Sequence, residues 1–268
     1  MIDLFSVSKD VVVVTGASGQ LGFSYQKAFL ERGSKVVGLD IVSSQSINDL
    51  KAEFADRYEF YILDITDKDL LIDVSKSIYK KFGNPTVLIN NAAIDSPPDA
   101  PLEETGPFES YPESSWDKVM DVNLKGTFLT CQVIGSMMAD ANKGSIINIA
   151  SIYGLVSPDQ NLYEYRRIKG ENFYKPVAYS VSKSGIINFT KYLAVYWAKK
   201  NIRVNTLTIG GVFNNQDGNF LKEYSSRIPI GKMADQHQYD GAVLFLASEA
   251  SSYMTGSNLI IDGGWTAI

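Results

Sequence analysis

Short apolar runs alternate along the chain with longer stretches in which apolar residues recur every three or four positions. The run from Val11 to Val14 is apolar throughout, which is typical of a strand buried on both faces of a parallel sheet. We expect strands over residues 11–15, 35–40, 58–63, 86–90, 144–150, 202–208 and 258–262. We expect helices over residues 20–32, 46–56, 67–82, 114–121, 123–140, 177–200 and 236–248. This alternation predicts an α/β fold with a doubly wound, seven-stranded parallel sheet and helices on both faces.

Composition supports a single domain and limits the partners. The 268 residues suffice for one α/β domain, which we expect to span residues 1–268. A net charge of −5 gives no reason to expect nucleic acid or an acidic membrane as a partner. Cys131 is the single cysteine and His237 the single histidine, so we expect no disulfide and no metal site. The first strand begins too early for a signal peptide and no apolar run spans a bilayer, so we expect a cytoplasmic protein.

A glycine-rich turn follows the first strand. Glycines at positions 16, 19 and 22 permit a tight turn and let a phosphate approach the backbone at the N-terminus of the next helix. The second strand ends in Asp40, 18 residues after Gly22, where a carboxylate can accept hydrogen bonds from an adenosine ribose. This order of elements predicts a dinucleotide-binding Rossmann fold; the alternative is an ordinary turn.

Tyr179 and Lys183 lie four residues apart at the start of a predicted helix, so both side chains point from one helical face. A tyrosine normally has a pKa of about 10, and a neighbouring cation lowers that value. The pair could therefore transfer protons near neutral pH. The alternative is that the tyrosine packs by chance on the lysine stem.

Together with further motifs in the same order, these features resemble the short-chain dehydrogenase/reductase family. The matching segments are residues 15–22, 64–65, 90–93, 122–126, 146–151, 179–183, 202–205 and 255–264. The resemblance implies an NAD(P)-dependent oxidoreductase that interconverts a secondary alcohol and a ketone by hydride transfer. It implies that Tyr179 exchanges the proton on the substrate oxygen and that Ser151 orients that oxygen. Lys183 would lower the tyrosine pKa and bind the ribose, and the Asn123 carbonyl would hold a water in a proton relay.

The resemblance also implies a cofactor site. The expected cofactor-binding residues are Gly16, Ser18, Gly19, Gln20, Leu21, Gly22, Asp40, Asp64, Ile65, Asn91, Ala92, Ala93, Tyr179, Lys183, Gly210, Val212 and Asn214. Asp40 should accept the 2′-hydroxyl of NAD and repel the 2′-phosphate of NADP, and no arginine follows it, so we expect NAD(H) to be preferred. The chain departs from the family pattern at Gln20, where a glycine is usual, and at Ile209-Gly210, which replaces Pro-Gly.

Two segments are longer than the family pattern implies. Ser151 lies 28 positions before Tyr179, roughly twice the usual gap, and the added residues 157–176 are expected to form one wall of the substrate site. The expected substrate contacts are Ser151, Tyr153, Arg166, Arg167 and Gly211, the arginines binding a phosphate or carboxylate. The alternative is a solvated loop, since nearby acids partly cancel the charge. Residues 95–113 are proline-rich and acidic. We expect them to form a lid or an oligomer contact near the entrance of the active site; the alternative is an ordinary surface loop.

These observations favour an enzyme acting on a sugar or sugar phosphate, with a narrower resemblance to bacterial surface-sugar and flagellin-modification oxidoreductases. One alternative is a 3-oxoacyl thioester reductase, although such enzymes usually prefer NADPH. The other is a non-catalytic nucleotide-binding protein, although such proteins commonly lose the tyrosine or the lysine. The predicted helices 123–139 and 177–200 are apolar nearly all round, which predicts pairing into a homodimer or homotetramer.

Overall fold

The computed structural model describes residues 3–96 and 101–268, so residues 97–100 of the segment 95–113 lie outside the described residues. Seven parallel strands form one sheet in the order β3-β2-β1-β4-β5-β6-β7. Their bounds are β1 Val11–Thr15, β2 Lys35–Asp40, β3 Tyr58–Ile62, β4 Val87–Asn90, β5 Gly144–Ser151, β6 Ile202–Ile209 and β7 Asn258–Ile261. The predicted fold class is confirmed.

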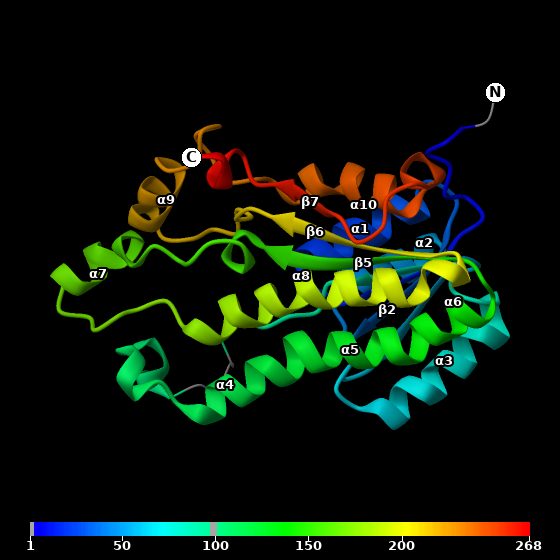
Figure 1. Ribbon diagram of the computed structural model, residues 1–268, viewed down its shortest axis with the longest axis horizontal. Coiled ribbons are helices and arrows are strands. Elements are labelled where there is room, and N and C mark those ends of the chain that lie inside the picture. The colour runs from blue at the N-terminus through cyan, green and yellow to red at the C-terminus, as the bar shows by residue number, and fades with distance from the viewer. Residues whose placement is uncertain (1–2, 97–100) are drawn as a thin grey trace.

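Helices cover both faces of the sheet (Figure 1). The α-helices are α1 Gln20–Leu30, α2 Gln45–Glu53, α3 Lys68–Phe82, α4 Glu113–Met120, α5 Thr127–Thr130, α6 Ser136–Asp140, α7 Glu164–Ile168, α8 Val177–Trp197, α9 Gly218–Ser225 and α10 Asp240–Ala247. Val12 and Val14 enter the core on the side of α1 and α10, whereas Val11 and Val13 enter the core on the side of α3 and α8. The apolar run of β1 therefore serves two cores, because successive side chains point to opposite faces.

The longest helical segment differs from the prediction. We expected a break between residues 121 and 123, but the chain is helical without interruption from Glu113 to Asp140, with π-helical stretches at Asp121–Gly126 and Cys131–Gly135. A Cβ on Gly126 would lie 2.5 Å from Ile65 Cδ1, so the glycine lets this helix approach the loop after β3. Wider turns of this kind are frequent at functional sites.

Other differences lie in short elements. Two helices were not expected, α7 inside the segment 157–176 and α9 after β6; Asp217 caps α9 by accepting hydrogen bonds from the Asn219 and Phe220 amides. The predicted helix 177–200 ends as a 3-10 turn at Ala198–Lys200, and the predicted helix 236–248 begins as one at Gln236–Tyr239. Further 3-10 turns are Leu102–Thr105, Phe108–Ser110, Ile152–Gly154, Gln160–Tyr163, Glu249–Ser251 and Trp265–Ala267.

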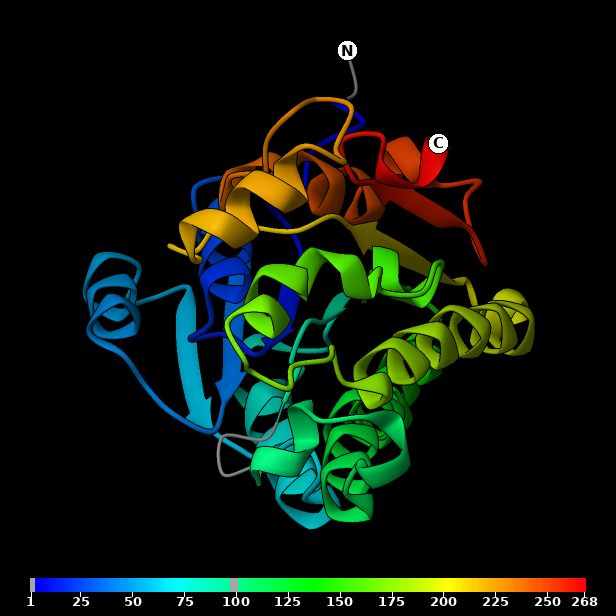
Figure 2. The ribbon, with the colours of Figure 1, turned by 90° about the vertical axis from the view of Figure 1, so that its left-hand side faces the viewer.

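The carboxyl ends of the strands face the viewer in Figure 2, and α9, α7 and the 3-10 turns of residues 102–110 surround that edge. Ligands of doubly wound sheets bind at this edge. Across residues 3–96 and 101–268, no helix has the length and apolar composition that would let it cross a bilayer.

Candidate active site

Ser151, Tyr179 and Lys183 meet where β5 ends beside the first turns of α8. Ser151 is the last residue of β5, and its Oγ accepts a hydrogen bond from the Tyr153 amide at 3.2 Å. The Lys183 ammonium lies 5.7 Å from the centre of the Tyr179 ring and donates to the Ile149 carbonyl at 2.9 Å. The structure thus brings the three predicted side chains together, and their catalytic role remains a prediction.

Burial dominates the electrostatics of this group. It raises the pKa of Tyr179 above its ordinary value, the Asp95 carboxylate raises it further, and a hydrogen bond with Ser151 lowers it. Burial also lowers the pKa of Lys183 to about 8, although the Asp95 carboxylate acts to raise it. The expected lowering of the Tyr179 pKa by Lys183 is therefore not seen in the protein alone, where desolvation of the phenolate is the largest influence on that pKa.

Asn123 occupies the π-helical stretch Asp121–Gly126 and is almost fully buried. Its amide group accepts from the Ile94 amide at 2.8 Å, and donates to the Ile94 carbonyl at 2.9 Å and to Ser182 Oγ at 3.0 Å. Its backbone carbonyl accepts from the Thr127 hydroxyl at 2.8 Å. The side chain thus joins the loop after β4 to α8, a positioning role that the sequence did not reveal.

A cleft of about 850 Å³ lies along the carboxyl ends of the strands, within the size range of ligand sites. The predicted cofactor residues that line it are Gly16, Gly19, Gln20, Leu21, Asp40, Asp64, Ile65, Asn91, Ala92, Ala93, Tyr179, Val212 and Asn214. Of the remaining predicted residues, Ser18 supports the cleft, because its amide donates to Asp40 at 2.9 Å. Gly22, Lys183 and Gly210 also lie outside the lining.

The backbone around the glycine-rich turn fits a dinucleotide. Gly16 has a φ of 64°, and a Cβ there would lie 2.8 Å from Ala92 Cα. A Cβ on Gly22 would lie 2.0 Å from the Gly16 carbonyl oxygen, so this glycine permits the close contact of α1 with the turn. Gly19 precedes α1 without a side-chain cap. The first amides of α1 are therefore available to a phosphate.

An ion pair between Asp95 and Lys175 joins the two long segments beside Tyr179. Asp95 lines the cleft, and the Lys175 ammonium lies 5.6 Å from the centre of the Tyr179 ring. The backbone also joins these segments, because the Tyr174 amide donates to the Thr105 carbonyl at 2.6 Å. Sequence reasoning missed this pair, since 80 residues separate its members and no local pattern relates them.

The two arginines of the segment 157–176 already have partners. Arg166 pairs with Glu171 at 2.6 Å, and its guanidinium lies 3.7 Å from the centre of the Phe173 ring. Arg167 pairs with Glu164 at 2.6 Å and donates to the carbonyls of Phe173 and Gln160. These contacts hold the segment in shape, so an anionic substrate would have to compete with carboxylates for either guanidinium. Binding of substrate by Arg166 and Arg167 stays a prediction.

An aromatic cluster lies between the segment 157–176 and Tyr179. Tyr163 packs against Phe173 and Phe220, with ring centres 4.9 and 5.8 Å apart, and Tyr224 stacks on Trp265 at 4.5 Å. Tyr153 and Tyr179 belong to the same cluster. The Gly211 amide donates to the Tyr224 hydroxyl at 3.0 Å, and a Cβ on Gly211 would lie 2.6 Å from that hydroxyl. The segment 157–176 therefore borders Tyr179 through apolar rings shared with α9.

Comparisons with known proteins find dehydrogenases and reductases of similar sequence and fold. The chain matches, over residues 16–266, the family model described as enoyl-(acyl carrier protein) reductase. An NAD-dependent glycerol dehydrogenase from Listeria innocua is 34% identical, with 98% of this chain and 96% of the relative covered. A D-threitol dehydrogenase from Mycolicibacterium smegmatis is 29% identical (98% and 95% covered), and a 3-oxoacyl-[acyl-carrier-protein] reductase from Thermotoga maritima is 32% identical (95% and 96% covered). The solved structure of a short chain dehydrogenase from Leptospira borgpetersenii with bound NAD+ has a TM-score of 0.84 at 34% identity, covering 99% of this chain and 97% of that one.

The burial of Lys183 predicts how the stability of the protein depends on pH. Because its folded-state pKa of about 8 lies below the ordinary 10.5, its charge destabilises only the folded state. This cost is complete below about pH 8 and disappears as the pH rises to 10.5. We expect Lys183→Met to increase the free energy of unfolding at pH 7 by about 2 kcal/mol, after allowing for the lost hydrogen bond to Ile149.

Urea unfolding at pH 7 and pH 10.5, at one protein concentration, measures this difference. Lys191→Met changes an exposed lysine on the same helix and is expected to alter the stability by less than about 0.5 kcal/mol at either pH. A Lys183→Met protein less stable than the wild type at pH 7 would contradict the prediction.

Proposed function

The chain belongs to the short-chain dehydrogenase/reductase family of NAD(P)-dependent oxidoreductases, and we propose that it interconverts a secondary alcohol and a ketone on a polyol or sugar. The observation that supports this proposal is the group formed by the buried Ser151 and Lys183 and the half-buried Tyr179, which lines the cleft. The similarity to relatives named for glycerol and threitol favours a polyol.

In this proposal each side chain has a separate task. The bound nicotinamide supplies the hydride chemistry. Tyr179 gives a proton to the substrate oxygen in ketone reduction and accepts it in alcohol oxidation. Ser151 orients that oxygen through its hydroxyl. Asn123 holds the loop after β4 against α8 and so keeps Tyr179 in place. Because burial raises its pKa, Tyr179 keeps its proton at neutral pH in the protein alone, and this is the proton that it would give to a ketone oxygen.

A 3-oxoacyl thioester reductase is the second candidate, favoured by the relative from Thermotoga maritima. The surroundings of Tyr179 argue for a polar substrate instead, because the Asp95–Lys175 ion pair lies beside the tyrosine. We propose NAD(H) as the preferred cofactor, because Asp40 lines the cleft and is followed by the exposed apolar residues Ile41 and Val42.

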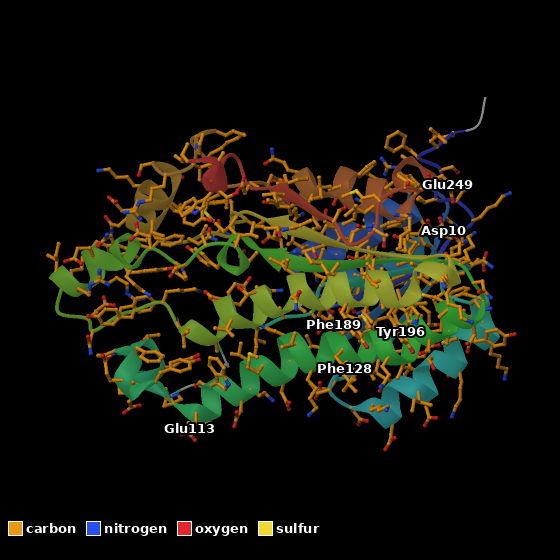
Figure 3. All side chains as sticks on the ribbon, in the orientation of Figure 1. Asp10, Glu113, Phe128, Phe189, Tyr196 and Glu249 are labelled. Atoms are coloured by element: carbon orange, nitrogen blue, oxygen red, sulfur yellow. The ribbon has the colours of Figure 1, made fainter. Side chains whose placement is uncertain are left out.

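We propose a homodimer or homotetramer that pairs through α5 and α8. Figure 3 shows Phe128 on α5 and Phe189 and Tyr196 on α8. Tyr192, Val195 and Tyr196 are 63%, 81% and 66% exposed, an unusual density of large apolar groups on one helix. A groove of about 1160 Å³ next to them is lined by residues of α4, α8 and the helical stretch 120–128.

Removal of the Tyr179 hydroxyl tests the proposal that the protein is a dehydrogenase. We expect Tyr179→Phe to lower kcat for polyol oxidation about 10²- to 10⁴-fold, because the proton acceptor is lost, while the Kd of NADH stays within about twofold. NADH formation with xylitol and fluorescence titration with NADH measure the two quantities. Tyr192→Phe, an exposed tyrosine on the same helix, is the matched control. Turnover of acetoacetyl-CoA with NADPH, in the absence of polyol turnover, would favour the thioester reductase.

Removal of one negative charge tests the cofactor proposal. We expect Asp40→Asn to raise kcat/KM for NADP relative to NAD about 10- to 100-fold, because the carboxylate no longer repels the 2′-phosphate. Asparagine retains an oxygen that can accept from the Ser18 amide. Asp64→Asn removes another carboxylate of the cleft and should affect the two cofactors alike. Better use of NADP than of NAD by the wild type would reject the proposal.

Light scattering tests the assembly. The chain mass is 29.6 kDa, so we expect a particle of two or four times that mass at micromolar concentration. Val195→Glu combined with Tyr196→Glu should shift the mass toward the monomer, because charges replace apolar contacts. A monomeric wild type would refute pairing.

A further inference from the structure

Side-chain amides hold the backbone at both members of the Asp95–Lys175 ion pair. Asn123 accepts a hydrogen bond from the amide of Ile94, the residue before Asp95, at 2.8 Å and donates one to the Ile94 carbonyl at 2.9 Å. Gln160 accepts from the Lys175 amide at 2.8 Å and donates to the Lys175 carbonyl at 3.2 Å. Because the backbone is fixed at both ends, the ion pair keeps its place beside the candidate catalytic group.

Two ammonium groups lie at nearly equal distances from the Tyr179 ring. The Lys183 ammonium is 5.7 Å from the ring centre, and the Lys175 ammonium is 5.6 Å from it. Asp95, the partner of Lys175, lines the same cleft as Tyr179. The Lys175 side chain is 13% exposed and the Asp95 side chain 52%, so water screens the pair only in part. A charge at such a distance changes how strongly a neighbouring group holds its proton.

The other titratable groups around Tyr179 are neutral, exposed or distant. Burial raises the pKa of three tyrosines in the same cluster, which are therefore neutral near pH 7: Tyr153, Tyr163 and Tyr224. On α4, which packs against α8, Lys118 lines the cleft but is exposed. Asp40 and Asp64 line it at the ends of β2 and β3, three and four strands away from β5. The charges that the structure places beside the ring are those of Asp95, Lys175 and Lys183.

The Asp95 carboxylate acts on both members of the tyrosine–lysine pair. After burial, it is the largest influence that raises the pKa of Tyr179, and it acts against burial to raise the pKa of Lys183. A negative charge favours the protonated form of either group, whereas an ammonium that neutralises this charge weakens the effect. The ion pair thus places opposing influences next to the proton that is exchanged.

We propose that Asp95 and Lys175 are positioning residues that set how readily Tyr179 exchanges its proton, the carboxylate favouring the phenol and Lys175 offsetting the carboxylate. This inference rests on the proposed function and adds two residues to the group that Ser151, Tyr179 and Lys183 form. A carboxylate without its lysine would hold the proton on the phenol and slow alcohol oxidation. An ammonium without its carboxylate would favour the phenolate and slow ketone reduction.

Single substitutions in the pair should shift the pH profile in opposite directions. Asp95→Asn removes the carboxylate, so the rising limb of log(kcat/KM) for xylitol oxidation at saturating NAD should move to lower pH by about one unit. Lys175→Met leaves the carboxylate without its partner, so the limb should move to higher pH. The double variant should return toward the wild-type profile, whereas loss of a purely structural contact would affect all three variants alike. Asp73→Asn, which breaks an exposed ion pair with Lys76, is the matched control and should leave the profile unchanged.

A titration that needs no turnover separates this inference from the proposed function. In protein that carries isotope-labelled lysine, NMR follows the Lys183 side chain, which the Lys183→Met variant assigns, and measures its pKa of about 8. We expect Asp95→Asn to lower this pKa and Lys175→Met to raise it. An unchanged Lys183 pKa in both variants, or pH profiles that move in the same direction, would overturn the inference. Opposite shifts of the Lys183 pKa in a protein that oxidises no polyol would refute the dehydrogenase proposal and leave the electrostatic role of the pair intact.

Discussion

Desolvation of Tyr179 and Lys183 is the constraint on which the site depends. Removing both side chains from water raises the pKa of the tyrosine and lowers that of the lysine to about 8, so neither ionised form is favoured by its surroundings. The fold tolerates this because α8 packs against β5 and β6, and the Ile149 carbonyl accepts a hydrogen bond from the lysine. Two apolar cores, one on each face of the sheet, supply the stability that such a site needs. Active sites commonly hold groups that are unfavourable for stability and useful for chemistry.

The cofactor half of the site follows from local features, which is why the sequence predicts it well. The glycine-rich turn, the helix after it and the acid at the end of β2 are contiguous, and parallel strands bring the ends of β1, β2, β4 and β5 to one edge. Most of the predicted residues accordingly line the cleft. Two of those that do not line it support it: Gly22 permits the approach of α1 to the turn, and the Ser18 amide holds Asp40.

The substrate half depends on contacts between distant parts of the chain, which sequence patterns do not reveal. Lys175 and its partner Asp95 lie 80 residues apart, so no local pattern identifies them as a pair. For Arg166 and Arg167, the sequence left open whether nearby acids cancel their charge, and the structure pairs them with Glu171 and Glu164. The short helix α9 was missed because its apolar residues serve the aromatic cluster rather than the main sheet, and α7 was missed because it has five residues and none of them is buried. The π-helical stretches were missed because their residues are compatible with an ordinary helix.

The aromatic cluster and the ion pair both border Tyr179, and both come largely from the two long segments. Tyr163 and Phe173 of residues 157–176 pack with Phe220 of α9 in the cluster to which Tyr179 belongs. Asp95 and Lys175 place opposite charges next to the tyrosine. The surroundings of the tyrosine therefore depend on segments that are longer than the family pattern implies, whereas the cofactor cleft depends on residues that the pattern contains.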